Sequence, residues 1–255
     1  MIKSILAVMY RNSLWAYRSP FRMTDVFLWP LVTLFTLTFF LSVFSNDVQF
    51  AGLLVTVVIA WRALYFVTFE TGSMFVEEHW SDSLPNIVVA PISTLEMAVG
   101  GAIGGVLKGI LVLVLCLSIG YFIYGYVLTE PLLLGVAMIF MMLTGFSIGL
   151  LLFGLACYYE KRNVFTMSFI FPEIIALVSG PYYDIHAVFP EWVTNIIHFF
   201  PTTHAFNVVK SIFGLAQPDY AMLVATTAAW LIAGFIINRI FFNMGRKKGT
   251  LVKVG

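Results

Sequence analysis

The feature that most limits the possible folds of this chain is a repeated run of apolar residues long enough to cross a bilayer. The hydrocarbon core of a bilayer is about 30 Å thick, and a helix crosses it in about 20 residues. The runs do not alternate polar and apolar residues, so they indicate helices rather than strands. The sequence predicts six spans, at residues 26–44, 48–69, 97–129, 131–159, 163–183 and 220–238. The expected fold class is therefore an all-α integral membrane protein.

The composition supports this class. Of the 255 residues, 60% are hydrophobic and 11% are charged, whereas roughly 25% are charged in soluble domains. The net charge of +1 gives no indication of a nucleic-acid partner. Cys116 and Cys157 lie inside apolar runs, without metal-ligand spacing or a disulfide framework. Arg11 interrupts the first short apolar stretch and no small-residue cleavage site follows, so we expect no cleaved signal peptide.

Lysine and arginine gather in three segments, which are the N-terminus, the connection between the fourth and fifth spans, and the C-terminal tail. With six spans these segments lie on one side of the membrane, and an excess of lysine and arginine marks the cytoplasmic side. We therefore expect both termini in the cytoplasm and the chain in the cytoplasmic (inner) cell membrane. The basic residues are Lys3, Arg11, Arg18, Arg22, Lys161, Arg162, Arg246, Lys247, Lys248 and Lys253.

Residues 1–20 predict an amphipathic helix that lies in the cytoplasmic membrane interface. An ordinary basic N-terminal anchor is the alternative. Pro20 is expected to end this helix before the first span. On a helical wheel, one face carries Ile2, Ile5, Leu6, Met9, Ala16 and Tyr17, and the opposite face carries Lys3, Ser4, Arg11 and Arg18.

The stretch 72–96 interrupts the apolar chain with four carboxylates and no lysine or arginine. Asp82 or Ser83 can cap a short helix, and Pro91 prevents this helix from continuing past Ala90. We expect a short cytoplasmic helix held roughly across the membrane normal. A loop with incidental caps is the alternative.

The third long helix has its own start signal and a small-residue repeat. Ser93 and Glu96 have the spacing of a capping box. Gly101, Gly105 and Gly109 then recur at every fourth residue, which favours close approach of a neighbouring helix, and Gly145 and Gly149 favour the same. The segment 100–109 is no phosphate-binding loop, because it lacks the Gly-Lys-Ser/Thr ending.

The region 185–219 is too short for a domain and too apolar for a free loop. It contains two short apolar pieces, 190–200 and 202–215, which meet near Pro201. Pieces of ten to fourteen residues indicate re-entrant or interfacial helices. We expect them at the external face.

Arg62, Lys108 and Glu173 are the charged residues inside the predicted spans. Such residues are rare in a bilayer and are candidates for functional sites. Two interpretations stay open: a structural ion pair of Glu173 with Arg62 or Lys108, or contacts with a substrate. Glu70 falls near the cytoplasmic end of its span, where we expect it to be hydrated.

The four histidines show no ligand spacing and are distributed over both sides of the predicted membrane. We therefore expect neither a metal site nor a catalytic histidine. They are His79, His186, His198 and His204.

Together these features resemble the type-2 permeases of ABC exporters, over nearly the whole chain. The resemblance rests on the basic amphipathic N-terminal helix, the six spans, and a short cytoplasmic helix that ends in the sequence VAPIS at 89–93. It rests also on Ser179-Gly180, which is followed by PEW at 190–192 and FPTTH at 200–204. It implies a single permease domain over residues 1–255.

The resemblance also implies partners and roles. The chain would form a homodimer and bind two copies of a separate ABC ATPase, which would hold the ATP and Mg²⁺. It would bind no cofactor itself and would not be an enzyme. Residues 77–96 would couple to the ATPase, and 185–219 would cap the pathway outside. The implied coupling residues are Arg11, Arg18, Glu77, Glu78, Asp82, Ala90 and Pro91, and those of the external region are Pro190, Trp192, Pro201 and His204.

The implied substrate is amphipathic, such as a lipid-linked glycan, a lipid or a hydrophobic drug. Two other classes compete with this interpretation. A secondary transporter would carry ion-coupling carboxylates near the midplane and often internal repeats, and only Glu173 fits that description. A membrane enzyme acting on lipid would need catalytic groups at one interface, for which Asp184, His186 and Glu191 are the candidates.

Overall fold

The computed structural model describes residues 2–18, 20–42, 47–80, 92–159 and 161–249. Every regular element in these residues is a helix. The helix expected near 84–90, and with it Asp82, Ala90 and Pro91, lies outside the described residues. The helices are α1 (Ile2–Arg18), α2 (Pro20–Ser42), α3 (Val48–Gly72), α4 (Met74–Trp80), α6 (Thr94–Tyr124), α7 (Pro131–Tyr158), α8 (Lys161–Val178), α9 (Ile185–Val188), α10 (Glu191–Ile197), α11 (Pro201–Ser211) and α12 (Tyr220–Lys248).

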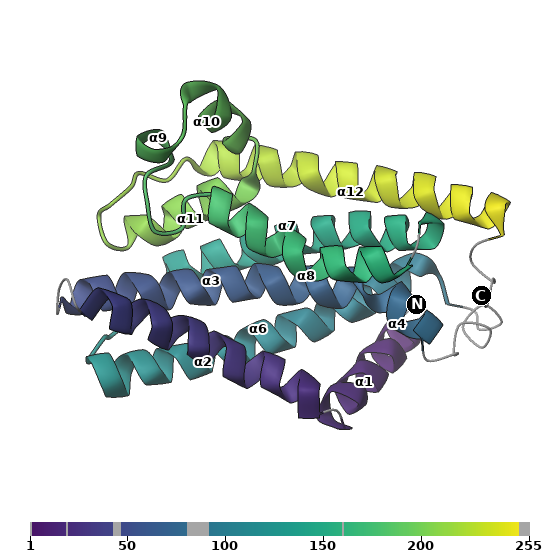
Figure 1. Cartoon of the computed structure of the whole chain (residues 1–255), viewed down its shortest axis with the longest axis horizontal. Helices are drawn as coiled ribbons and strands as arrows, with labels where there is room; N and C mark the ends of the chain where they lie inside the picture. Colours follow the sequence, from purple (N-terminus) through teal and green to yellow (C-terminus); the bar gives the residue numbers. More distant parts are fainter. Residues whose placement is uncertain (1, 19, 43–46, 81–91, 160, 250–255) are drawn as a thin grey trace.

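The long helices form a bundle with two distinct ends. α4, the start of α1 and the end of α12 lie at one end, and α9 and α10 lie at the other (Figure 1). Four helices of the described chain, α3, α6, α7 and α12, are long and apolar enough to cross a membrane. Shorter apolar stretches occupy Met23–Phe39 in α2 and Asn163–Val178 in α8. The chain is thus an all-α multi-pass membrane protein.

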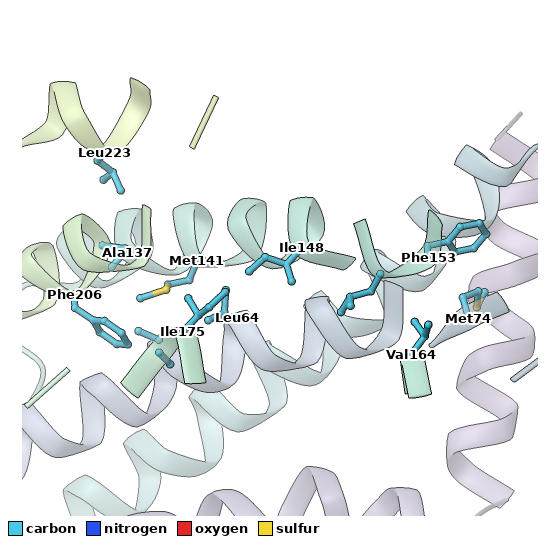
Figure 2. Close-up of a cluster of buried hydrophobic side chains, with 14 of the residues drawn as sticks. Leu64, Met74, Ala137, Met141, Ile148, Phe153, Val164, Ile175, Phe206 and Leu223 are labelled. Carbon is cyan, nitrogen blue, oxygen red and sulfur yellow. The ribbon is translucent and has the colours of Figure 1, made fainter. Parts of the chain in front are cut away.

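α3 is the central helix. Its side chains are buried from Gly52 to Gly72, with the exception of Trp61, which is half-buried. A helix that is apolar on all sides belongs in the interior of a bundle. α6 and α7 pack along α3, and α12 packs on the other side of α7. Figure 2 shows part of this core, where Leu64 of α3 faces Met141 and Ile148 of α7.

Glycines allow these backbones to approach closely. A Cβ atom added to Gly105 of α6 would lie 2.6 Å from the Phe66 carbonyl oxygen of α3. One added to Gly145 of α7 would lie 2.6 Å from the Leu64 carbonyl oxygen. No side chain fits into such gaps, so the helix-packing interpretation of the glycine repeat is confirmed at these positions.

α6 begins as predicted but ends earlier. The Ser93 Oγ accepts a hydrogen bond from the Glu96 backbone N–H at 3.2 Å, and the Glu96 carboxylate accepts one from the Ser93 N–H at 2.8 Å. The predicted capping box is therefore confirmed. The helix stops at Tyr124 and not near Thr129, because Gly125 adopts the left-handed conformation with φ of 67° and caps it.

The expected N-terminal helix is present and ends at Arg18, before Pro20, as predicted. Pro20 itself begins α2, so this helix starts earlier than the predicted span at 26–44. Val8 of α1 is buried against Gly100 of α6, where an added Cβ would come within 2.5 Å of the Val8 Cγ1. Ile2 and Leu6 stay exposed on another side of α1. The helix therefore has one face packed on the bundle and a separate apolar face turned outward.

The region 185–219 divides into two parts. α11 is packed against α7, and its first six residues, from Pro201 to Phe206, are all buried. α10 is more exposed, because Trp192 and Ile196 retain 68% and 53% of their accessible surface. Pro190 directly precedes α10 as its N-cap residue.

Candidate functional site

α2, α3 and α8 surround a cleft of ≈690 Å³ on one side of the bundle. It lies toward the end that carries α4, since Glu77 of that helix contributes to its lining. Its size falls within the range of binding sites for small molecules. The lining residues are Asp25, Trp29, Thr33, Arg62, Tyr65, Phe69, Glu77, Phe165, Phe169, Ile170, Glu173 and Ile174.

Arg62 joins the three walls of this cleft. Its Nη1 donates to the Glu173 Oε1 on α8 at 3.3 Å, and its Nη2 donates to the Thr33 Oγ1 on α2 at 2.7 Å. The guanidinium carbon lies 5.4 Å from the centre of the Tyr65 ring, within cation–π distance. The Arg62 side chain is 9% exposed and that of Glu173 is 37% exposed. Of the two predicted partners for Glu173, the structure selects Arg62.

Two further carboxylates line the cleft. Asp25 of α2 is half-buried and hydrogen-bonded by the Tyr65 side chain. Glu77 of α4 is buried, and its Oε1 accepts a hydrogen bond from the Ser73 Oγ at 3.2 Å. The acidic groups thus come from α2, α4 and α8.

Aromatic rings form a continuous wall between α3 and α8. The ring centres of Phe69 and Phe169 are 4.4 Å apart, and those of Phe165 and Phe169 are 5.1 Å apart. Tyr65 stacks on Phe69 with a centre distance of 6.0 Å. On the α2 side, Trp29 is 55% exposed and contributes a further ring to the lining.

Both outer walls contain a proline within the helix, Pro30 in α2 and Pro172 in α8. A proline inside a helix removes one main-chain hydrogen bond and favours a bend. Each proline directly adjoins a lining residue, Trp29 in α2 and Glu173 in α8.

A second ion pair lies deeper in the bundle, between Lys108 of α6 and Glu70 of α3. Their side chains are 11% and 4% exposed. The expectation that Glu70 is hydrated at the membrane boundary is therefore wrong, because α6 covers it and supplies its counter-charge. The three predicted intramembrane charges, together with Glu70, form two separate pairs.

In the described part of the acidic segment, the two glutamates of α4 lie inside the bundle. Glu77 and Glu78 are 7% and 2% exposed, and their predicted role in coupling to an ATPase stays a prediction. Arg11 of α1 forms an ion pair with Glu78, and the Asn12 Nδ2 lies 3.3 Å from the Met74 Sδ. For Glu78, the counter-charge that is missing from 72–96 therefore comes from the N-terminal helix. Arg18, at the end of α1, is exposed.

At the opposite end, three of the four histidines form a row. The ring centres of His186 and His198 are 5.4 Å apart, and those of His198 and His204 are 6.0 Å apart. The histidines are thus divided between the two ends of the bundle, since His79, on α4, lies at the other end. Burial, and then the neighbouring His204 and His186, lower the pKa of His198. Over the described ranges, no His, Cys, Asp or Glu cluster is arranged to hold a metal ion.

Asp184 lies beside this row as the N-cap of α9, where its carboxylate accepts from the His186 backbone N–H at 3.0 Å. Glu191 is exposed in the first turn of α10. A capping role accounts for the geometry of Asp184.

Sequence reasoning missed Asp25 and the aromatic wall. Asp25 was passed over because it directly precedes the first apolar run. A spacing signal was present, since the lining residues recur at every fourth position on both outer walls. These residues are Asp25, Trp29 and Thr33 in α2, and Phe165, Phe169 and Glu173 in α8.

Comparisons with known proteins do not assign the chain. A scan against protein-family models finds no match, and a search of curated proteins finds no relative. The function is therefore argued from the cleft and the charge distribution.

Proposed function

We propose that this chain is the membrane subunit of an ATP-driven exporter of the type-2 ABC class. The observation that carries the proposal is the charged, aromatic cleft between α2, α3 and α8, because a transport subunit needs a binding site within its helices. The chain has no phosphate-binding loop, so ATP would bind to a separate ATPase. Two copies of that ATPase and two copies of this chain would form the exporter.

The proposed topology has six spans, in which α2 and α8 join the four long apolar helices. At a rise of 1.5 Å per residue, the 23 residues of α2 extend about 34 Å and the 18 residues of α8 about 27 Å. Both lengths are close to the thickness of the hydrocarbon core.

The basic end of the bundle would face the cytoplasm. α1 and the start of α8 lie there, together with Arg246, Lys247 and Lys248 at the end of α12. The connections 125–130 and 179–219 carry one basic residue between them, Lys210, whose Nζ donates to the Tyr183 carbonyl oxygen at 2.6 Å. This asymmetry supports cytoplasmic termini. α9 and α10 would then cap the pathway outside, with α11 re-entering the bundle.

A second copy of the chain would close the open side of the cleft. α8 exposes Ile170 and Ile174 in the lining of the cleft, and α2 exposes Phe27 and Leu28. Exposed apolar side chains on these two helices suit contact with a symmetric partner or with lipid. The homodimer would place two clefts face to face.

Coupling to the ATPase would use the contacts between α1, α4 and α3. The Arg11–Glu78 ion pair ties α1 to α4, and α4 follows α3 after a single residue, Ser73. α4 also contributes Glu77 to the cleft. A movement of α1 or α4 that is caused by the ATPase would therefore reach the cleft directly, through Glu77 and the start of α4. Asp82, Ala90 and Pro91 continue from α4 and stay the predicted docking segment.

The test is reconstitution of the chain in proteoliposomes, alone and with an ABC ATPase from the same genome. We expect no ATP hydrolysis by the chain alone, and substrate-stimulated hydrolysis with the ATPase. Glu78→Gln should lower the stimulation, whereas Lys3→Gln, at an exposed position of α1, should leave it unchanged.

Other outcomes would favour the competing classes. Transport driven by an ion gradient without an ATPase would indicate a secondary transporter. Turnover of a lipid by the chain alone would indicate a membrane enzyme. Hydrolysis of ATP by the chain in the absence of other subunits would overturn the assignment.

A further inference from the structure

The cleft contains one carboxylate, Asp25, that no ion pair neutralises among the described residues. Arg62 lines the cleft but is paired with Glu173. Asp25 is hydrogen-bonded by the Tyr65 side chain, and the charges of Lys108 and Arg62 act on it only from a longer range. A carboxylate in a low-dielectric site is costly unless a positive charge or hydrogen bonds compensate it. The cleft therefore favours a positively charged occupant.

The guanidinium of Arg62 is already engaged. Glu173 and Thr33 accept from its two terminal nitrogens, and the Tyr65 ring lies beneath it. An anionic ligand would have to displace Glu173 and would then meet Asp25 across the cleft. The geometry thus disfavours an anion at the same place.

The remaining lining suits a particular kind of cation. Rings of Trp29, Tyr65, Phe69, Phe165 and Phe169 present aromatic faces or edges to the cleft. Aromatic faces attract cations, and the attraction is larger when the cation is easily desolvated. An inorganic ion or a primary ammonium holds its water strongly, whereas a cation surrounded by carbon does not.

We infer that the cleft between α2, α3 and α8 binds a lipophilic organic cation, with Asp25 as the carboxylate that faces its charge and the α3–α8 aromatic wall as its apolar support. This inference rests on the proposed function, because it names the substrate class of the exporter. The cleft volume of ≈690 Å³ admits one ligand of drug size.

Two probes of matched shape and opposite charge test the inference, tetraphenylphosphonium and tetraphenylborate. The purified chain is placed in nanodiscs, and binding of each probe is measured by equilibrium dialysis against empty nanodiscs. We expect saturable binding of tetraphenylphosphonium, and binding of tetraphenylborate that is at least about tenfold weaker.

Variants assign the binding to the cleft. Asp25→Asn should weaken tetraphenylphosphonium binding about tenfold, whereas Glu191→Gln, an exposed carboxylate at the far end, should not change it. Glu173→Gln frees the Arg62 guanidinium and should shift the preference toward tetraphenylborate. Phe169→Leu keeps an apolar side chain but removes a ring, so it should also weaken binding of the cation. This second variant tests the inference even if Asp25→Asn does not fold.

Three results would each overturn the inference: no saturable binding of tetraphenylphosphonium, equal or stronger binding of tetraphenylborate by the unaltered chain, or undiminished cation binding in folded Asp25→Asn or Phe169→Leu. These measurements need no ATPase, so they separate the two proposals. If the cation binds in the cleft but no ABC ATPase drives export, the proposed function fails and the site stands. If an ATPase drives export of other amphipaths and the cation does not bind, the inference fails and the function stands.

Discussion

Replacing Lys108 with methionine should destabilise the protein, because it leaves Glu70 of α3 buried without its counter-charge. Lys108→Met keeps a long unbranched side chain but removes the ammonium group that pairs with Glu70. Because the Glu70 side chain is only 4% exposed, the variant leaves it without compensation inside the bundle. Breaking a buried pair in this way costs about 3–5 kcal/mol.

The double variant Glu70→Gln with Lys108→Met carries neither charge, and its stability should lie within about 1 kcal/mol of the unaltered chain.

The assay is unfolding in mixed micelles with increasing dodecyl sulfate, followed by circular dichroism. Lys247→Met, at an exposed position near the end of α12, is the control and should change the free energy of unfolding by less than about 0.5 kcal/mol. If the effects of Glu70→Gln and Lys108→Met simply add in the double variant, the two residues do not form the pair on which this reasoning depends.

The remaining predictions concern packing, orientation and acid sensitivity. Gly105→Ala places a Cβ 2.6 Å from the α3 backbone and should destabilise by about 1–3 kcal/mol in the same assay, whereas Gly135→Ala meets nothing within 4 Å and should be neutral or stabilising. Cysteines introduced at the exposed Asn195 and Lys247 should react with membrane-impermeant thiol reagents from opposite faces of the membrane. The background reaction should be low, because both native cysteines are buried. Reaction of both introduced cysteines from the same face would contradict the proposed topology. The pKa of His198 is lowered in the folded protein, so its contribution to stability is present at neutral pH and is lost as the pH falls below about 6.5. His198→Gln should therefore reduce the loss of stability between pH 7 and pH 5, and an unchanged pH profile would contradict this.

The helices could be predicted from the sequence because their signals are local. Apolar runs, the Ser93–Glu96 capping box and the spacing of Gly101 and Gly105 each depend on a few neighbouring residues, and all of them recur in the structure. The early end of α6 was also a local signal, since Gly125 could have been recognised as a helix stop.

The ion pairs could not be predicted in this way. Glu173 had two candidate partners, and only the rotation of α3 and α6 about their axes decides which cation faces it. Glu78 pairs with Arg11, which lies on a different helix and far away in the sequence. The absence of lysine and arginine from 72–96 therefore did not show that its carboxylates lack counter-charges, because the partner of a charged residue can lie on a neighbouring helix.

The glycine contacts and the two helix-interior prolines distinguish a closely packed part of the bundle, α3, α6 and α7, from two helices that can bend, α2 and α8. α6 and α7 touch the α3 backbone without intervening side chains, so these helices form a stiff frame that resists relative sliding. α2 and α8 stand outside this frame, and each lacks one main-chain hydrogen bond at Pro30 or Pro172. A bend at either proline would therefore change the width of the cleft beside Trp29 and Glu173 while the contacts of α3 with α6 and α7 stay in place.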